Sequence, residues 1–136
     1  MTAQLTDEQR SYLTDHMWAV LATGRMDGSP QVSMIGYVLD AEDRMVISIK
    51  SYTAKWKNAL RQPRVAIMVP DGRTNATIYG TAECIDTDPL RAELTADVFG
   101  RLSGQERPDP TSIIPTLDEQ QRTVLRVTAD TFLFNV

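Results

Sequence analysis

The residues between positions 18 and 85 constrain the fold most, because apolar and polar side chains alternate there with the two-residue period of β-strands. Two of these segments, 18–24 and 30–40, flank the sequence RMDGS. Its Asp27-Gly28 pair suits a tight hairpin turn, where central residues take up positive φ angles. These segments therefore predict an antiparallel hairpin.

Four further segments have strand patterns. Residues 44–51 alternate, with three apolar side chains on one face, and residues 75–85 alternate in the same way. Residues 64–69 are apolar on both faces, which is typical of a central strand. Residues 124–136 complete the set as a C-terminal strand.

Three helices are predicted between the strands. The first covers residues 6–16 and is capped by Thr6. A short second helix begins at Thr53 and ends at Pro63, because proline disfavours helical backbone in the residue before it. Asp88-Pro89 provides a cap and a first-position proline for the third helix.

The segment after the third helix is expected to be irregular. Residues 103–116 contain three prolines, so we expect a loop there. A short polar helix is expected at 117–122, just before the last strand.

Six antiparallel strands with two or three helices favour a mostly β fold, namely a closed or nearly closed β-barrel with helices packed outside. An open α+β sandwich is the alternative. The length of 136 residues and the 42% hydrophobic content suit one globular core, so residues 1–136 are expected to form a single domain.

Charge is unevenly distributed along the chain. The net charge is −4, yet the stretch from Arg44 to Pro70 has six basic residues and no acidic one. All 18 acidic residues therefore lie outside it, together with the other eight basic residues. The basic residues of the stretch are Arg44, Lys50, Lys55, Lys57, Arg61 and Arg64.

The helix that begins at Thr53 carries part of this charge in an unfavourable place. Lys55 and Lys57 lie in its first turn without an acid, although the helix dipole and the unpaired N–H groups favour negative charge there. Ser48 and Lys50 share one face of the preceding strand. A phosphate bound by these side chains and the free N–H groups would remove the penalty.

Two other interpretations of the basic segment stay open. The lysines can form a solvated face and tolerate a cost of about a few tenths of a kcal/mol each. Nucleic-acid binding is a weaker interpretation, because the basic residues are few, only Tyr52 and Trp56 lie among them, and the whole chain is negative. We therefore expect no nucleic-acid partner.

Several classes of function are disfavoured. Cys84 is the single cysteine and His16 the single histidine, so neither an internal disulfide nor a usual zinc site is expected. We find no Ser/His/Asp set and no close carboxylate pair of the kind that hydrolysis uses. The polar N-terminus resembles no signal peptide, and no apolar run reaches bilayer length, so a cytoplasmic protein without a membrane partner is expected.

The segment AVLATGRMDGSPQVSMIGYVLD, followed by ISIKSYTAKWKNALRQPRVAIMV, resembles the split-barrel flavin and deazaflavin oxidoreductases of the pyridoxamine 5'-phosphate oxidase superfamily. The likeness is closest to the actinobacterial branch that uses the deazaflavin coenzyme F420, and it is best over residues 5–85. The matching positions are Val20 to Thr23, Asp27-Gly28, Pro30-Gln31, Ser48, Lys55, Asn58, Arg61 and Pro63-Arg64.

This resemblance implies a homodimer of six-stranded split barrels with two cofactors at the subunit interface. In such relatives the cofactor phosphate is held by a third-strand serine and two basic residues of the following helix, which correspond to Ser48, Lys55 and Lys57. The ring rests against the backbone of the second strand. The corresponding residues here are Ser33, Met34, Ile35 and Gly36.

The chain departs from the family pattern at three places. Lys50 adds a charge that is not part of the motif, and Ala54 stands where true pyridoxamine phosphate oxidases carry an arginine. The C-terminal sequence TFLFNV lacks their arginine-rich substrate segment. Vitamin B6 synthesis is therefore not expected.

The resemblance implies an F420-dependent oxidoreductase that transfers a hydride from reduced deazaflavin to a small unsaturated or quinone-like acceptor. The cofactor carries this chemistry, so no side chain is assigned a catalytic role. F420 has a carboxylate-rich tail beyond its phosphate, and Lys50, Lys57, Arg61 and Arg64 extend positive charge toward it. The alternatives are an FMN-dependent oxidoreductase of the same fold and a non-catalytic flavin- or haem-binding protein.

Aromatic side chains are candidates for lining the acceptor site. Aromatic residues on strands are more often part of a core, so this interpretation competes with a structural one. The candidates are Tyr37, Tyr79, Trp56, Phe132 and Phe134.

Overall fold

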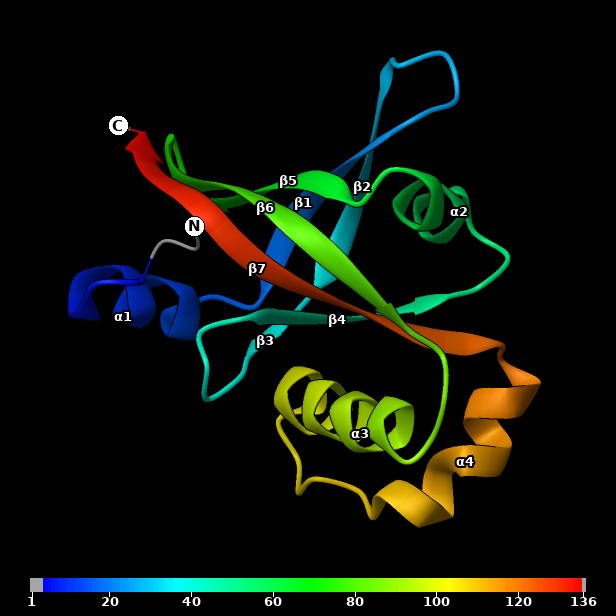
Figure 1. The fold of residues 1–136 in the computed structure, drawn as a ribbon. Coiled ribbons are helices and arrows are strands. Elements are labelled where there is room, and N and C mark those ends of the chain that lie inside the picture. Colours follow the sequence, from blue (N-terminus) through cyan, green and yellow to red (C-terminus); the bar gives the residue numbers. More distant parts are fainter. Residues whose placement is uncertain (1–3, 136) are drawn as a thin grey trace.

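A computed structural model describes residues 4–135, which form a curled antiparallel sheet with helices packed outside it (Figure 1). The helices are α1 (Asp7–Asp15), α2 (Ala54–Arg61), α3 (Leu90–Ser103) and α4 (Pro110–Glu119). The strands are β1 (Trp18–Gly24), β2 (Pro30–Gly36), β3 (Val38–Leu39), β4 (Met45–Lys50), β5 (Arg64–Asp71), β6 (Thr74–Ile85) and β7 (Arg122–Asn135). The predicted mostly β fold with flanking helices is confirmed, and the sandwich alternative is wrong.

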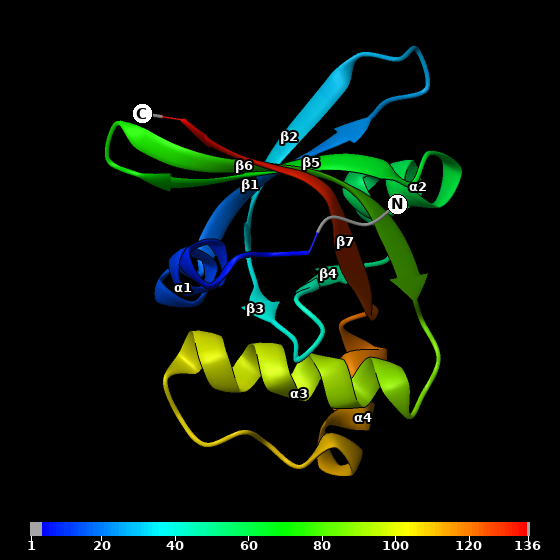
Figure 2. The same ribbon diagram turned by 60° about the vertical axis from the view of Figure 1, so that its left-hand side comes forward.

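The sheet has seven strands in the order β2-β1-β5-β6-β7-β4-β3, rather than the six expected. The difference arises in segment 30–40, which was predicted as one strand and instead breaks at Tyr37. Before the break β2 pairs with β1, and after it β3 pairs with β4 at the opposite edge of the sheet. One residue thus links the two edges, so the sheet must curl into a split barrel (Figure 2).

Tyr37 is fixed at this crossing by α1 and the chain that follows it. Its buried hydroxyl donates to the carbonyl of Leu13 at 2.6 Å, and its N–H donates to the carbonyl of Met17 at 3.0 Å. Next to the crossing β2 and β4 lie beside each other. Beyond the crossing, β2 and β4 do not pair with each other, because β2 continues along β1 at one edge of the sheet. We call this break between β2 and β4 the split of the barrel.

Local sequence signals position the first elements as predicted. The Thr6 hydroxyl accepts the Gln9 N–H at 3.2 Å, and the Gln9 side chain accepts the Thr6 N–H at 2.9 Å, which together form a capping box. Gly28 has φ +87° in the β1–β2 turn, a value that glycine adopts without strain. The hairpin and the first helix are therefore confirmed.

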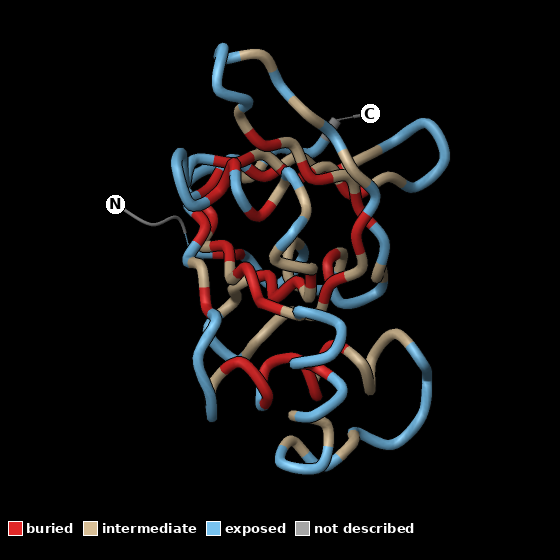
Figure 3. The backbone as a smooth tube through the Cα atoms, turned by 90° about the vertical axis from the view of Figure 1, so that its right-hand side faces the viewer, coloured by how far each residue is buried: buried red, intermediate tan, exposed pale blue. Residues whose placement is uncertain are grey.

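The core has two layers (Figure 3). The inner faces of the strands fill the barrel, where Met45, Ile47 and Ile49 of β4 point inward as the alternation predicted. The outer face of β4, β6 and β7 packs against α3. That second cluster contains Val46, Ile85, Leu94, Val98 and Val124.

The structure differs from prediction in residues 103–122. The expected loop over 103–116 is a helix from Pro110 onward, and the helix expected at 117–122 is the end of this α4 and the start of β7. Asp109 caps α4 by accepting the Ser112 N–H at 3.0 Å, and Pro110 occupies the first position, where a missing N–H costs nothing. Pro115 lies inside the helix nevertheless.

Candidate functional site

The end of β4 brings two predicted site residues to one face. Because Ile47 and Ile49 fill the barrel, Ser48 and Lys50 point to the outer side of the sheet, and both are half-buried. This is the same face on which Val46 packs against α3. The sequence prediction that Ser48 and Lys50 share a strand face is confirmed.

The chain then turns directly from β4 into α2. The N–H and the hydroxyl of Thr53 both donate to the Lys50 carbonyl, at 3.1 and 2.7 Å. Thr53 occupies the N-cap position of α2, as predicted. Its side chain, however, makes no hydrogen bond to the first-turn N–H groups, so the predicted capping interaction is absent from the described residues. The first-turn N–H groups of α2 consequently have no side-chain acceptor, and the turn places the helix start beside Lys50.

The structure separates the two helix lysines. Residues two apart on a helix point about 200° away from each other. Lys55 shares its face with Asn58 and Ala59, which are buried three and four residues later, whereas Lys57 shares its face with Leu60 and Arg61, which are exposed. Lys55 thus faces the barrel and Lys57 faces solvent. Neither lysine forms an ion pair with another described residue.

Asn58 and Arg61 connect α2 to the β1–β2 hairpin. The buried Asn58 amide donates to the Thr23 hydroxyl at 3.1 Å and to Gln31 Oε1 at 3.0 Å. The guanidinium of Arg61 donates to the Gly24 carbonyl at 2.6 Å. Several residues of the family-like pattern therefore hold α2 in place, and Arg61 lies at the far end of the helix from Ser48.

The segment predicted to support the cofactor ring lies along the split. Residues 33–36 belong to β2, which pairs only with β1, so every second residue points its N–H and C=O groups toward the open edge. The side chain of Ile35 is in the core and that of Met34 is 63% exposed. Gly36 lies so close to Leu102 of α3 that an added Cβ would approach it to 2.5 Å. Ser48 and Lys50 lie on β4, which does not pair with β2, so the strands that carry the predicted ring and phosphate residues are not hydrogen-bonded to each other.

Sequence reasoning missed Arg122, which lies beside this group. Its Nη1 donates to the Ser48 hydroxyl at 3.4 Å, and it sits directly opposite Lys50 in the β4–β7 register. Arg122 was assigned to a polar helix, and it is 74 residues from Ser48 in the chain. Only the pairing of β4 with β7 brings the two residues together. A last strand predicted to begin at Arg122, and not at residue 124, would have included this residue in the sheet.

The outer face of the sheet exposes an apolar surface. Met34 and Val20 of β2 and β1 continue in register into Met68 of β5, and Trp18 is 53% exposed on the same face. Further exposed apolar side chains on this face are Val32 of β2, Tyr79 of β6 and Leu133 of β7. The area is contiguous across several strands, which is unusual for a surface that only contacts water.

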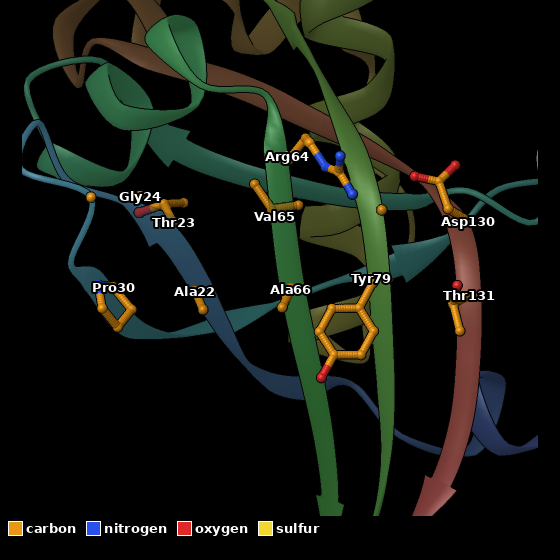
Figure 4. Close-up of a pocket in the computed structure, with 12 residues that line it drawn as sticks. Ala22, Thr23, Gly24, Pro30, Arg64, Val65, Ala66, Tyr79, Asp130 and Thr131 are labelled. Atoms are coloured by element: carbon orange, nitrogen blue, oxygen red, sulfur yellow. The ribbon is translucent and has the colours of Figure 1, made fainter.

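A pocket of about 320 Å³ lies on this face (Figure 4). Small residues such as Ala22 of β1 and Ala66 of β5 form its floor. Ala22 pairs with Ala66 across the strands, and Ala66 pairs in turn with Tyr79 of β6. Arg64 lines the same pocket and forms no ion pair within residues 4–135. Gly80 is required beside Tyr79, because a Cβ there would lie 2.4 Å from the Thr128 carbonyl oxygen.

The aromatic candidates separate into two groups. Tyr37 and Trp56 are buried in the barrel core, so the prediction that they line an acceptor site is wrong. Phe134 stacks edge-on against Tyr12 and Phe132 near α1. Tyr79 is half exposed and lines the outer pocket.

The other chemically active residues have structural partners. His16 is hydrogen-bonded through Nδ1 to the Tyr12 carbonyl at 2.7 Å and through Nε2 to Asp71 at 3.1 Å. Burial raises the pKa of the Cys84 thiol, which makes it less reactive. Within residues 4–135, no three His, Cys, Asp or Glu side chains cluster in a way that could hold a metal ion. No helix in the same range is long and apolar enough to span a membrane.

Known structures share this fold. A conserved hypothetical protein from Mycobacterium tuberculosis superimposes with a TM-score of 0.81 at 20% identity, over 98% of this chain and 86% of that one. An F420 reductase gives a TM-score of 0.71 at 22% identity, over 95% and 98% of the two chains. HutZ, a heme storage protein from Vibrio cholerae, gives 0.74 at 21% identity, over 98% and 96%.

The family comparison covers nearly the whole chain. The sequence pattern of the family described as pyridoxamine 5'-phosphate oxidase matches residues 5–134. That range includes the barrel, the β4–α2 turn and the last strand. The chain therefore belongs to the pyridoxamine 5'-phosphate oxidase family.

Proposed function

We propose that the chain is an F420-dependent oxidoreductase that passes a hydride from reduced deazaflavin to a small unsaturated or quinone-like acceptor. The observation that carries this proposal is the segment from Lys50 to Arg64, in which no cation has a carboxylate partner among residues 4–135, in a chain of net charge −4. The split-barrel fold binds flavin-type cofactors, and one protein similar in fold is an F420 reductase.

The chain's own residues would bind and orient the cofactor. Ser48, Lys50 and Lys55 would hold its phosphate together with the free N–H groups of α2. Backbone groups of residues 33–36 would hold the ring, and Lys57, Arg61 and Arg64 would attract the carboxylates of the tail. When bound, the deazaflavin supplies the hydride. Barrel residues around the split would exclude water from it.

FMN is the second candidate cofactor, since it presents a phosphate to the same residues but has no tail. Haem storage, the third candidate, would require His16 to exchange its Nε2 hydrogen bond with Asp71 for a bond to iron, or another residue to supply the iron ligand. Direct titration separates the cofactors. We expect F420 to bind the protein more tightly than FMN, measured by fluorescence. Tighter binding of FMN would overturn the deazaflavin assignment and leave the family assignment intact.

We also propose that the active form is a cytoplasmic homodimer. The apolar outer face bearing Trp18, Met34 and Met68 is too continuous to be left in water, and two-fold pairing with a second copy is the common way to cover such a surface. Light scattering at micromolar concentration should give twice the chain mass. A monomer mass would contradict this assembly.

A further inference from the structure

Arg122 is a half-buried cation that forms no ion pair with any of residues 4–135. Its Nε donates to Gln120 Oε1 at 2.9 Å, its Nη1 lies 3.4 Å from the Ser48 hydroxyl, and its guanidinium carbon is 5.5 Å from the centre of the Phe99 ring. All three partners are neutral. Burial lowers the pKa of Arg122, so its surroundings disfavour the charge that they enclose.

Other arginines of residues 4–135 are arranged differently. Five of them bind carboxylates, namely Arg10, Arg44, Arg91, Arg107 and Arg126. Arg126 is the best comparison, because it lies on the same strand and the same face as Arg122. Its Nε and Nη2 donate to Glu83 Oε1 at 3.0 and 2.9 Å. Five of the eleven arginines thus bind carboxylates, whereas Arg122 has no anionic partner among residues 4–135 although it is half-buried.

A second cation adds to the imbalance. The β4–β7 register places Lys50 directly opposite Arg122, and like charges at directly opposite positions repel one another. The Lys50 ammonium lies 5.9 Å from the centre of the Tyr52 ring, and it too has no carboxylate partner in the described part of the chain. Two cations and the Ser48 hydroxyl therefore share one small area of the sheet. An anion bound between them would relieve both the repulsion and the cost of burial.

We propose that Arg122 binds the cofactor phosphate together with Ser48 and Lys50, in the role that the family-like pattern gives to Lys57. A guanidinium presents two parallel N–H groups to phosphate oxygens, which an ammonium does not. Lys57 points to solvent on the opposite side of α2 from Lys55, whereas Arg122 is next to Ser48. The inference rests on the phosphate site of the proposed function, but not on which cofactor supplies the phosphate.

FMN and riboflavin differ only by the phosphate, so they isolate its contribution. We expect Arg122→Met to weaken FMN binding at least tenfold and to change riboflavin binding less than twofold. The matched control, Arg126→Met, removes a paired arginine from the same strand face and should change neither. Unchanged FMN affinity, or equal losses for FMN and riboflavin in Arg122→Met, would overturn the assignment.

Inorganic phosphate tests the site without any flavin. Phosphate should raise the melting temperature of the wild type more than chloride does at equal ionic strength, since it binds only the folded state. Arg122→Met should lose this increment and Arg126→Met should keep it. This outcome would support the site even if no flavin bound and the proposed function failed. Equal increments in wild type and Arg122→Met would refute it.

Stability in the absence of phosphate distinguishes a ligand residue from a structural one. Removing Arg122 also removes its repulsion with Lys50, so ligand-free Arg122→Met should melt at or above the wild-type temperature. A structural arginine behaves in the opposite way, because its removal leaves a carboxylate unpaired. Melting of Arg122→Met below Arg126→Met would therefore count against the proposal.

Discussion

Two neighbouring clusters of basic side chains are organised in opposite ways. Arg91, at the start of α3, binds Asp88 and Asp118, both at 2.7 Å, and thereby joins α3 to α4. Arg122 and Lys50 lie close by, since Arg91 also donates to the Arg122 carbonyl at 3.3 Å, yet they have no carboxylate. Charge that is balanced within the chain holds elements together, whereas the unbalanced charge of Arg122 and Lys50 is available to an anion from outside the chain.

The paired cluster predicts the largest effect. Arg91→Met would leave Asp88 and Asp118 facing a neutral side chain, and breaking a buried pair from one side typically costs about 3–5 kcal/mol. Because the Asp118 side chain is 63% exposed, we expect the free energy of unfolding to fall by about 2–3 kcal/mol. Urea denaturation measures this loss. A loss below about 0.5 kcal/mol would mean that the paired cluster does not stabilise the fold.

The unpaired cations predict a loss of binding in place of a loss of stability. Lys55→Ala should weaken F420 at least tenfold, or about 1.4 kcal/mol, because Lys55 faces the barrel beside the helix start. Its unfolding free energy should stay within about 0.5 kcal/mol of wild type, since Lys55 has no partner to lose. Fluorescence titration and urea denaturation of the same preparation test both statements. If Lys55→Ala were destabilised but bound F420 as tightly as the wild type, Lys55 would be a structural residue and the proposed division between the two clusters would be wrong.

Lys57 is expected to contribute less to F420 binding than Lys55 does. It is exposed and points away from the barrel, so Lys57→Ala should weaken F420 by only about 0.2–1 kcal/mol. Added salt should shrink that loss, because exposed charges are screened. FMN, without a tail, should be insensitive to the substitution. Affinity measured at low and high salt gives the answer, and a salt-independent loss as large as that of Lys55→Ala would place Lys57 at the phosphate.

The smallest effect concerns His16, a titratable cation with partners, far from both clusters. Its pKa is raised chiefly by the hydrogen bond to the Tyr12 carbonyl and also by Asp71, while burial opposes the shift. Because the pKa of His16 is higher in the folded than in the unfolded protein, its protonation stabilises the folded state. This stabilisation is complete below the unfolded-state pKa and is lost as the pH rises through the folded-state pKa. Unfolding free energies at about pH 6 and about pH 8 should therefore differ more in wild type than in His16→Gln. Equal differences would show that His16 does not contribute.

Local patterns predicted the elements of this fold better than their ends. Alternation identified the inward residues of β4, and the Asp27-Gly28 turn identified the hairpin, because each depends on neighbours in the chain. The break at Tyr37 depends on α1, whose Leu13 carbonyl accepts the tyrosine hydroxyl, so no local pattern indicates it. Proline count was misleading in α4, since Asp109 and Pro110 form a favourable helix start.

The candidate site was predictable where its residues are close in sequence. Ser48, Lys50 and Lys55 lie within eight residues, and alternation plus one tight turn suffice to place them at one end of the barrel. The opposite directions of Lys55 and Lys57 follow from helix geometry and were open to prediction. The position of Arg122 could not be predicted in this way, because it lies next to Ser48 only through the pairing of β4 with β7, two strands far apart in the chain.

The single-residue crossing at Tyr37 ties the two edges of the sheet to the first helix. The β3–β4 pairs at Val38 and Leu39 begin directly after it, and the last β1–β2 pair, Trp18 with Gly36, ends directly before it. The tyrosine hydroxyl donates to the Leu13 carbonyl of α1, so a helix outside the sheet helps to fix the point where the chain passes from one edge to the other. Curvature of the barrel and placement of α1 are therefore coupled through one side chain.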